Sequence, residues 1–494
     1  MTRRQTKVTL IHHPTAALHV DGFADSDLSD LEGGIYLGNT YERVMPSSLL
    51  RVASVLDRHP ALEVDILDLR LSDTKHRDIY KTIEWENQYR IRVERVGNPF
   101  DYCNDRIEDA DWVGLSSHFT FESGIIRDLI HHLKKTKPQI KIMVGGADVK
   151  ARPSDYIAFG ADLAFVGDCD PNVIEAYRGG KHVIAHRPSL IEEFAEPAFE
   201  KLPRLRDYVE SYDGPVPKGV GYPIGYMYLS RGCPRECDFC ETRRTKFDRL
   251  SLDQSLVALE RYRSAGITTL NFTDDNLLLI AAKPSGRSDL IELFKTMRRM
   301  GFAWEFPIGL EIGRFIKDGQ VDEELMEVMF DHSVDTATGR FTGAYRMYVP
   351  LETFERREHY KKLRSGTEQN KVLTWLAGAG LPEIDFGVVL PPSATEETFS
   401  ATRDGYLQVK DIIHSNGATK ARYAAFHLIP IALFRAMQTK YTIDEFPEAW
   451  NLYFPNYDGD HFTGRELFER RLKLIKEIDP PNFRNMRFGQ YTYG

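Results

Sequence analysis

Three cysteines lie within eight residues and form a C-x3-C-x2-C pattern, at Cys233, Cys237 and Cys240. The chain has only two other cysteines, so this cluster is not a disulfide framework. Thiolates on one loop favour a soft metal centre, either zinc or an iron–sulfur cluster. A structural zinc site normally has four protein ligands, whereas the nearest histidines in the sequence are His186 and His332. Three thiolates would leave one coordination position open, which is a catalytic arrangement rather than a structural one.

The segments around these residues predict an α/β protein. Strand-like segments alternate with helical patterns over residues 1–185 and predict a doubly wound, Rossmann-like domain. These segments begin at Val8, Leu62, Trp112, Ile140 and Asp162. Residues 122–135 have apolar side chains at helical spacing, which is typical of a helix that covers a sheet. Ligands of such sheets bind at the carboxyl ends of the strands, so Ser116, Ser117, Gly145 and Gly146 are either ligand contacts or ordinary loop residues.

A second domain is expected after a linker. Residues 186–224 contain six prolines, which interrupt regular structure, and are predicted to be that linker. Residues 225–435 are predicted to form a (β/α)6 partial barrel whose active site lies at the carboxyl ends of its strands. Its strand-like segments begin at Gly225, Thr268, Ala303, Tyr345, Glu383 and Ala424, and the cysteines follow the first of them. Residues 436–494 are rich in aromatics and are expected to be a substrate-covering lid or a cap that packs on the open side of the barrel.

The composition argues against several classes of function. The 494 residues carry 64 Lys and Arg against 73 Asp and Glu, a formal net charge of −9, without a conspicuous basic tract. Nucleic acid is therefore not an expected substrate. No apolar run approaches the ~18 residues that span a bilayer, and the N-terminus has no signal-peptide pattern. The expected location is the cytoplasm.

The cysteine pattern after the first strand of a barrel, with Phe239 just before the last cysteine, resembles the radical S-adenosylmethionine (SAM) superfamily. The resemblance implies a [4Fe–4S] cluster on Cys233, Cys237 and Cys240 that binds SAM and cleaves it to a 5′-deoxyadenosyl radical. It also implies SAM contacts along the barrel, for which the candidates are Phe239, Asp274, Asp275, Glu311 and Glu352. Asp274 and Asp275 could instead cap a helix, and Glu311 could begin an exposed one. Pro350 stands where similar enzymes have a glycine before the residue that corresponds to Glu352.

The first 180 residues resemble the class of radical SAM enzymes whose N-terminal domain binds cobalamin. The likeness lies in a Pro-x-x-Leu helix from Pro46, in Gly114-Leu-Ser-Ser, in Met143-Val-Gly-Gly and in Phe165-Val-Gly-Asp. It implies cobalamin contacts at Ser116, Ser117, Gly145, Gly146 and Gly167, with the glycines allowing close approach of a large tetrapyrrole. The Asp-x-His-x-x-Gly signature is absent, so no protein ligand to cobalt is predicted. Trp85 is either a contact to the cobalamin or a buried structural residue.

The resemblance implies a cobalamin-dependent radical SAM C-methyltransferase that acts on an unactivated carbon of a small metabolite or natural-product intermediate. Such an enzyme would use cobalamin, SAM and the cluster together with an external one-electron donor of the flavodoxin or ferredoxin type. The alternative is a cyclase or ring-rearranging enzyme that binds cobalamin without transferring methyl. A sensor and a methylthiotransferase are disfavoured, the latter because only Cys103 and Cys169 precede the barrel.

Overall fold

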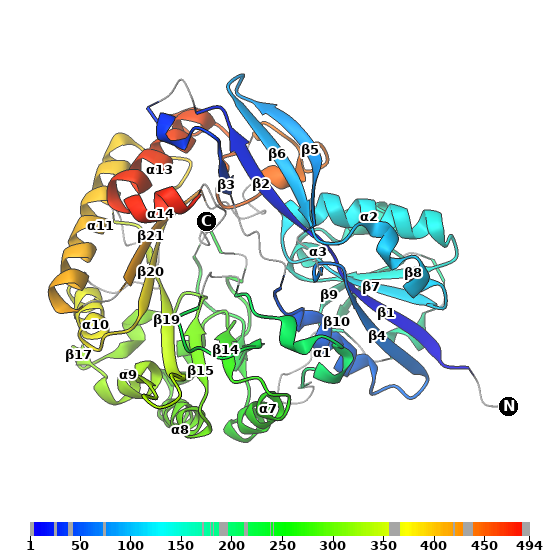
Figure 1. Ribbon diagram of the computed structural model, residues 1–494, viewed down its shortest axis with the longest axis horizontal. Helices are drawn as coiled ribbons and strands as arrows, with labels where there is room; N and C mark the ends of the chain where they lie inside the picture. The colour runs from blue at the N-terminus through cyan, green and yellow to red at the C-terminus, as the bar shows by residue number, and fades with distance from the viewer. Residues whose placement is uncertain are drawn as a thin grey trace.

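The structure is a computed structural model that describes residues 4–23, 27–37, 43–72, 76–169, 172–177, 179–180, 182–186, 196–211, 216–237, 239–240, 242–354, 366–417, 420–427 and 438–486. Figure 1 shows two parallel sheets side by side, each flanked by helices, and an antiparallel sheet that rises above the first of them. No helix in these ranges is both long and apolar enough to cross a membrane.

The first parallel sheet has the strand order β10-β9-β8-β7-β1-β4. The direction of winding reverses between β1 and β7, and this switch point is where open α/β sheets bind their ligands. The strands are β1 (Thr6–His12), β4 (Leu62–Asp68), β7 (Trp112–Ser116), β8 (Lys141–Gly145), β9 (Leu163–Gly167) and β10 (His182–His186). The helices are α1 (Ser47–Leu56), α2 (Ser123–Thr136), α3 (Ala147–Ala151), α4 (Pro153–Ala158) and α5 (Val173–Ala176). All five predicted strands are present, and β10 is an addition.

The antiparallel sheet was not predicted from the sequence. It has the order β3-β2-β6-β5 and is formed by β2 (Thr15–Asp21), β3 (Ile35–Leu37), β5 (Arg77–Trp85) and β6 (Tyr89–Val96). The turn between β5 and β6 has φ values of 54° at Glu86 and 55° at Asn87. Two successive left-handed residues match the right-handed twist of a hairpin. It is a separate sheet, and it is joined to the first parallel sheet by the chain because β2 follows β1 directly.

The second parallel sheet is the predicted barrel, with the order β11-β14-β15-β19-β20-β21. Its strands are β11 (Ile224–Met227), β14 (Thr269–Phe272), β15 (Ala303–Phe306), β19 (Phe341–Glu352), β20 (Glu383–Val389) and β21 (Lys420–Phe426). Helices α7 (Leu252–Ser264), α8 (Pro284–Met300), α9 (Glu323–Phe330), α10 (Gly366–Gly378) and α11 (Glu396–Asn416) lie around its outside (Figure 1). Among the described strands β11 and β21 are not paired with each other, so the barrel is open. The sixth strand begins at Lys420, four residues before the predicted start at Ala424. Residues 428–429 of the predicted strand lie outside the described ranges.

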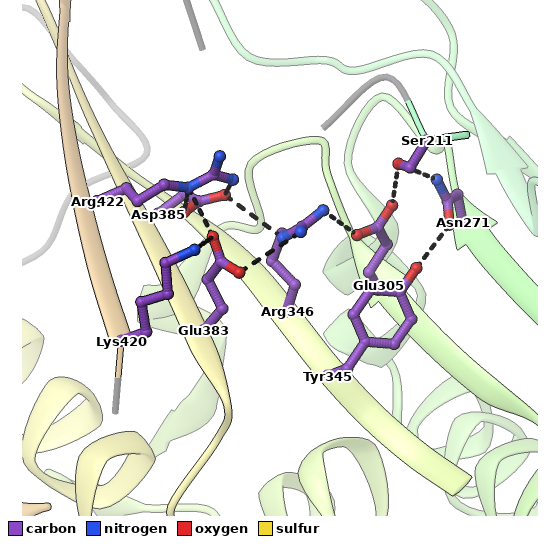
Figure 2. A network of polar contacts seen from close by, with 9 residues as sticks. All are labelled: Ser211, Asn271, Glu305, Tyr345, Arg346, Glu383, Asp385, Lys420 and Arg422. Atoms are coloured by element: carbon purple, nitrogen blue, oxygen red, sulfur yellow. Dashed lines mark hydrogen bonds and ion pairs between the residues drawn. The ribbon is translucent and has the colours of Figure 1, made fainter. Parts of the chain in front are cut away.

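Charged side chains fill the amino-terminal half of the barrel (Figure 2). The fully buried Arg346 contacts Glu305 at 2.7 Å, Glu383 at 3.5 Å and Asp385 at 3.8 Å. Arg422 contacts Glu383 and Asp385, both at 2.6 Å. Pairing of opposite charges is what makes such burial tolerable. Ser211, from the predicted linker, donates to Glu305 at 2.7 Å, so the linker reaches this end of the barrel.

The C-terminal segment packs on the antiparallel sheet as well as on the barrel. It contains α13 (Gly464–Ile478), α14 (Pro480–Asn485) and a short 3-10 helix, η10 (Pro447–Ala449). The fully buried Trp85 lies 4.3 Å from Phe454 and 5.4 Å from Phe468 between ring centroids. Trp85 is therefore a structural residue. Phe454 and Phe468 of the C-terminal segment pack on the antiparallel sheet, and not only on the barrel. Phe488 and Tyr491 lie outside the described residues, and the predicted boundaries at 185, 224 and 435 stay predictions.

Candidate functional site

A small hairpin closes the cysteine loop. Strand β12 (Ser230–Arg231) pairs with β13 (Asp248–Arg249), and the three cysteines lie on the loop between them. The Cys233 amide donates to Thr245 Oγ1 at 2.8 Å, and the Thr245 amide donates to the Cys233 carbonyl at 3.0 Å. Gly232 has a φ of +80°, and a Cβ there would lie 2.1 Å from the Lys246 carbonyl oxygen, so only glycine fits. These contacts fix the backbone on both sides of Cys233.

The three thiols form no disulfide and differ in burial. Cys233 and Cys237 are buried, and Cys240 is partly exposed. The Asn276 amide nitrogen lies 3.6 Å from Cys233 Sγ, and Thr242 Oγ1 lies 3.2 Å from Cys240 Sγ. Within the described part of the chain, no three His, Cys, Asp or Glu side chains are arranged to hold a single metal ion. Three thiols on one loop still suit an iron–sulfur cluster as a donor set. Ligation of a cluster by these cysteines stays a prediction. A contact of Phe239 with SAM also stays a prediction.

Asp274 and Asp275 hold the start of the cysteine loop. The buried Asp274 carboxylate accepts the amides of Leu229 and Ser230, at 3.0 Å and 2.6 Å, and the Ser230 hydroxyl at 2.6 Å. Asp275 accepts the Gly232 amide at 2.6 Å. Burial raises the pKa of Asp274 to about 7, although these hydrogen bonds act in the opposite direction. Neither residue caps a helix, since the residue before η7 (Leu277–Ala282) is Asn276. Their contact with the SAM ammonium group stays a prediction.

Glu311 is also joined to the cysteine loop. Its carboxylate pairs with Arg235, which lies between the first two cysteines, and accepts the Asn276 amide at 3.0 Å. The side chain is buried, so it is not the exposed helix start that was the alternative prediction. Asn276 thus bridges Glu311 and Cys233, and neither Arg235 nor Asn276 was singled out in the sequence. The signals that could have identified them are the position of Arg235 between two cysteines and that of Asn276 directly after the Asp-Asp pair.

Glu352 ends β19 in a strained conformation. It is buried and has a φ of +61°, and the pairing of β19 with β20 shifts register between Pro350 and Glu352. A left-handed non-glycine residue at a strand end is uncommon and is often found at functional sites. The bulge turns the end of β19 at the carboxyl edge of the barrel. A contact of Glu352 with SAM stays a prediction.

The predicted cobalamin contacts lie together at the carboxyl edge of the first sheet. Ser116 ends β7, and its hydroxyl lies 3.3 Å from that of Ser48 at the start of α1. The Ser117 amide donates to the Gly145 carbonyl at 2.7 Å. Gly146 has a φ of +113°, and a Cβ there would lie 2.2 Å from the Ser117 carbonyl oxygen. Gly146 is therefore needed for packing between two turns of the protein itself. Gly167 ends β9 with a φ of +118°.

Histidines at the end of β1 complete this edge, and they were not identified from the sequence. His12 Nδ1 bonds Asp68 Oδ1 at 2.9 Å. His13 lies between its two hydrogen-bond partners, the Pro14 carbonyl at 2.7 Å and the Ser116 carbonyl at 3.0 Å. Burial lowers the pKa of His13 to about 4, so the ring is neutral at pH 7 and donates to only one of these two carbonyl groups at a time. Their place directly after an apolar strand is the signal that could have identified them.

Two contacts join the carboxyl edge of the first sheet to the barrel. Asp168, which follows Gly167, forms an ion pair with Arg231 at the start of the cysteine loop. On α1, the Arg51 guanidinium lies 3.5 Å from the centre of the Tyr228 ring, one residue beyond β11. The edge with the predicted cobalamin contacts therefore faces the cysteine loop.

Known proteins share parts of this sequence and fold. Residues 101–171 match the family model of the B12 binding domain. A methyltransferase of Streptomyces wedmorensis, cytidylyl-2-hydroxyethylphosphonate methyltransferase, is 28% identical over 149 residues, which are 29% of this chain and 23% of that enzyme. The match thus spans about a quarter of the length of the relative.

Two solved proteins have a similar fold. The cobalamin-dependent SAM radical enzyme OxsB, with aqua-cobalamin and SAM bound, has a TM-score of 0.58 and 13% identity over 98% of this chain and 70% of its own. The radical SAM methyltransferase TsrM of Kitasatospora setae, with tryptophan and a SAM analogue bound, has a TM-score of 0.53 and 14% identity over 85% of this chain and 73% of its own. The chain has the fold of the cobalamin-dependent radical SAM enzymes. This confirms the predicted fold class and the predicted resemblance, and the B12 binding domain match supports the cobalamin prediction for the first sheet.

Proposed function

We propose that this chain is a cobalamin-dependent radical SAM enzyme that transfers a methyl group to a carbon of a small molecule. The observation that carries the proposal is the loop of three cysteines, held by buried carboxylates and facing the edge of a B12 binding domain. When bound, the cluster with SAM supplies a primary carbon radical and cobalamin supplies a methyl group.

In this proposal the residues of the chain hold and orient these groups. Cys233, Cys237 and Cys240 would hold the cluster, and Asp274 and Asp275 fix the backbone amides that begin their loop. Glu311 and Glu352 are the buried carboxylates at the barrel mouth that would orient SAM. A radical of this kind needs a site that excludes competing hydrogen donors, and buried ion-paired side chains fill the other end of the barrel.

The polar groups of the cobalamin would lie along Ser116, Ser117, Gly145, Gly146 and Gly167. An external donor of the flavodoxin or ferredoxin type would deliver electrons to the cluster. A small-molecule substrate is supported by similar proteins, because one is named as a phosphonate methyltransferase and another was solved with tryptophan. Both are small molecules, and we propose an unactivated carbon of a small metabolite as the site of methylation.

Cofactor content is the first test. Protein expressed with cobalamin and purified without oxygen should contain iron and sulfide in the ratio of a [4Fe–4S] cluster and one cobalamin per chain. Cys237→Ala should lose the iron and keep the cobalamin. The matched control is Cys103→Ala, which removes a buried thiol that donates to the Phe100 carbonyl far from the loop. Equal iron in both variants would contradict the assignment of the cluster.

Product analysis separates methyl transfer from rearrangement. With SAM and titanium(III) citrate, a methyltransferase should give both S-adenosylhomocysteine and 5′-deoxyadenosine. Formation of 5′-deoxyadenosine without S-adenosylhomocysteine would contradict methyl transfer and indicate the cyclase alternative. Cys237→Ala should give no 5′-deoxyadenosine.

A further inference from the structure

The loop that follows β7 lies at the switch point of the first sheet. Residues 117–122 leave the carboxyl end of β7, which neighbours β1 on the other side of the reversal. Ligands of open α/β sheets bind beyond the strand ends at this point. The loop also belongs to the segment that matches the B12 binding domain.

Three buried side chains fix this loop. The Ser117 hydroxyl lies 2.6 Å from the Tyr156 hydroxyl, and Thr120 donates to Asp148 at 2.6 Å. Glu122, at the end of the loop, accepts Arg70 at 3.0 Å. A hydrogen-bonded buried side chain is costly to displace, so three of them hold the loop backbone in a single conformation.

Two side chains between these anchors are left exposed to solvent, His118 and Phe119. Phe119 is 50% exposed, although it is a large apolar residue. Its ring stacks on that of Phe121 with centroids 5.4 Å apart. A fixed loop that presents an imidazole and a phenyl ring to solvent at a ligand-binding edge is suited to the face of a large, flat ligand.

The His118 ring differs from the two histidines beside it. The rings of His12 and His13 are held by Asp68 and by two carbonyl groups, whereas no described residue forms a hydrogen bond with the His118 ring. Solvent reaches the His118 ring, so a ligand bound at this edge can reach it as well. An imidazole nitrogen is among the commonest metal ligands in proteins.

We infer that His118 is an axial ligand of the cobalt ion of bound cobalamin. The inference rests on the proposed function, because it requires cobalamin at this edge. The His118 ring nitrogen donates its lone pair to Co(II) in the axial position. The new Co–N bond replaces the bond to a water molecule, which leaves to solvent, and the oxidation state does not change. This assigns a protein ligand although the chain lacks the Asp-x-His-x-x-Gly signature.

Electron paramagnetic resonance of the Co(II) form tests the inference. The full chain is loaded with cobalamin, reduced to Co(II), and prepared with either natural or 15N-labelled histidine. An axial nitrogen from the protein gives a triplet splitting, which becomes a doublet on 15N labelling, whereas the benzimidazole nitrogen of the cofactor does not respond to this label. We expect the doublet in the labelled wild type, its loss in His118→Ala, and its retention in His131→Ala. His131 is a matched control because it is an exposed histidine on α2, the helix that follows the same loop.

The outcomes separate this inference from the proposed function. Cobalamin bound at one per chain without a label-dependent splitting would overturn the axial role of His118 and leave the proposed function standing. A doublet that persists in His118→Ala and disappears in His12→Ala would show that His12 is the axial ligand, and it would overturn our inference about His118. A chain that binds no cobalamin would overturn both.

Discussion

Arg346→Met is the substitution whose effect the structure defines best. Arg346 is fully buried and contacts three carboxylates, but only two of these, Glu383 and Asp385, retain Arg422 as a partner. In the described structure Glu305 loses its ion pair and keeps the hydrogen bond from the Ser211 hydroxyl. Removal of one partner of a buried ion pair costs ~3–5 kcal/mol. We expect Arg346→Met to lower the free energy of unfolding by about that amount at pH 8.

The loss should depend on pH. Burial already raises the pKa of Glu305, with the charge of Arg346 acting against it, so the pKa rises further in the variant. The folded variant then binds a proton that the unfolded chain releases, and stability falls as the pH rises above the pKa of an unfolded Glu, ~4.3. The destabilisation should therefore be smaller at pH 5 than at pH 8. Glu305→Gln in the Arg346→Met background should restore part of the loss at pH 8.

Urea unfolding followed by circular dichroism and tryptophan fluorescence measures these differences. Trp304 is next to Glu305 in the barrel, and its indole donates to the Met329 carbonyl at 2.9 Å, so part of the fluorescence reports on this region. Arg299→Met is the control, because Arg299 is 62% exposed and pairs with Glu292 on the surface. Surface pairs contribute ~0–1 kcal/mol. A loss below ~1 kcal/mol for Arg346→Met, or an equal loss at pH 5 and pH 8, would refute the reasoning.

Three further predictions concern other parts of the molecule. Trp85→Ala should destabilise the chain by ~3–5 kcal/mol in urea unfolding, because it empties the buried site between the antiparallel sheet and the C-terminal segment. Gly146→Ala should lower the free energy of unfolding by ~1–3 kcal/mol, because the residue has a positive φ and a new Cβ would contact Ser117. At Gly145 the nearest atom to a new Cβ is 3.7 Å away, so Gly145→Ala should cost less. Similar losses of stability in both variants would contradict the packing argument. Because the pKa of Asp274 rises from 3.8 to about 7 on folding, the wild type should lose stability relative to Asp274→Asn as the pH rises through that range, and parallel pH profiles in thermal unfolding would refute this.

The sequence predicted the parallel strands because each is a short apolar run between turn residues. This pattern identified all five strands of the first sheet that were expected and all six of the barrel. The antiparallel sheet was missed although apolar or aromatic residues, which are buried, alternate with the less buried arginines from Tyr89 to Val93 of β6. The Glu86-Asn87 turn between β5 and β6 was a further sign of a hairpin.

The candidate site could be predicted only in part. The cysteine loop and the strand-end glycines follow from local sequence. The roles of Asp274, Glu311 and Gly146 depend on what the fold brings against them: loop amides, Arg235 and the Ser117 backbone. Such contacts join residues that are distant in sequence, and no local pattern encodes them.

The contact between the antiparallel sheet and the C-terminal segment has a consequence for how the chain folds. Trp85 packs on Phe454, and Asp30 pairs with Lys476 at 2.9 Å, so residues near the beginning of the sequence meet residues near its end. Contacts of such long sequence separation form slowly, because a large loop must be closed before they are made. During synthesis the apolar face of the hairpin formed by β5 and β6 has no partner until the C-terminal segment has been made. We expect this face to be the part of the nascent chain most prone to aggregation and to binding by chaperones.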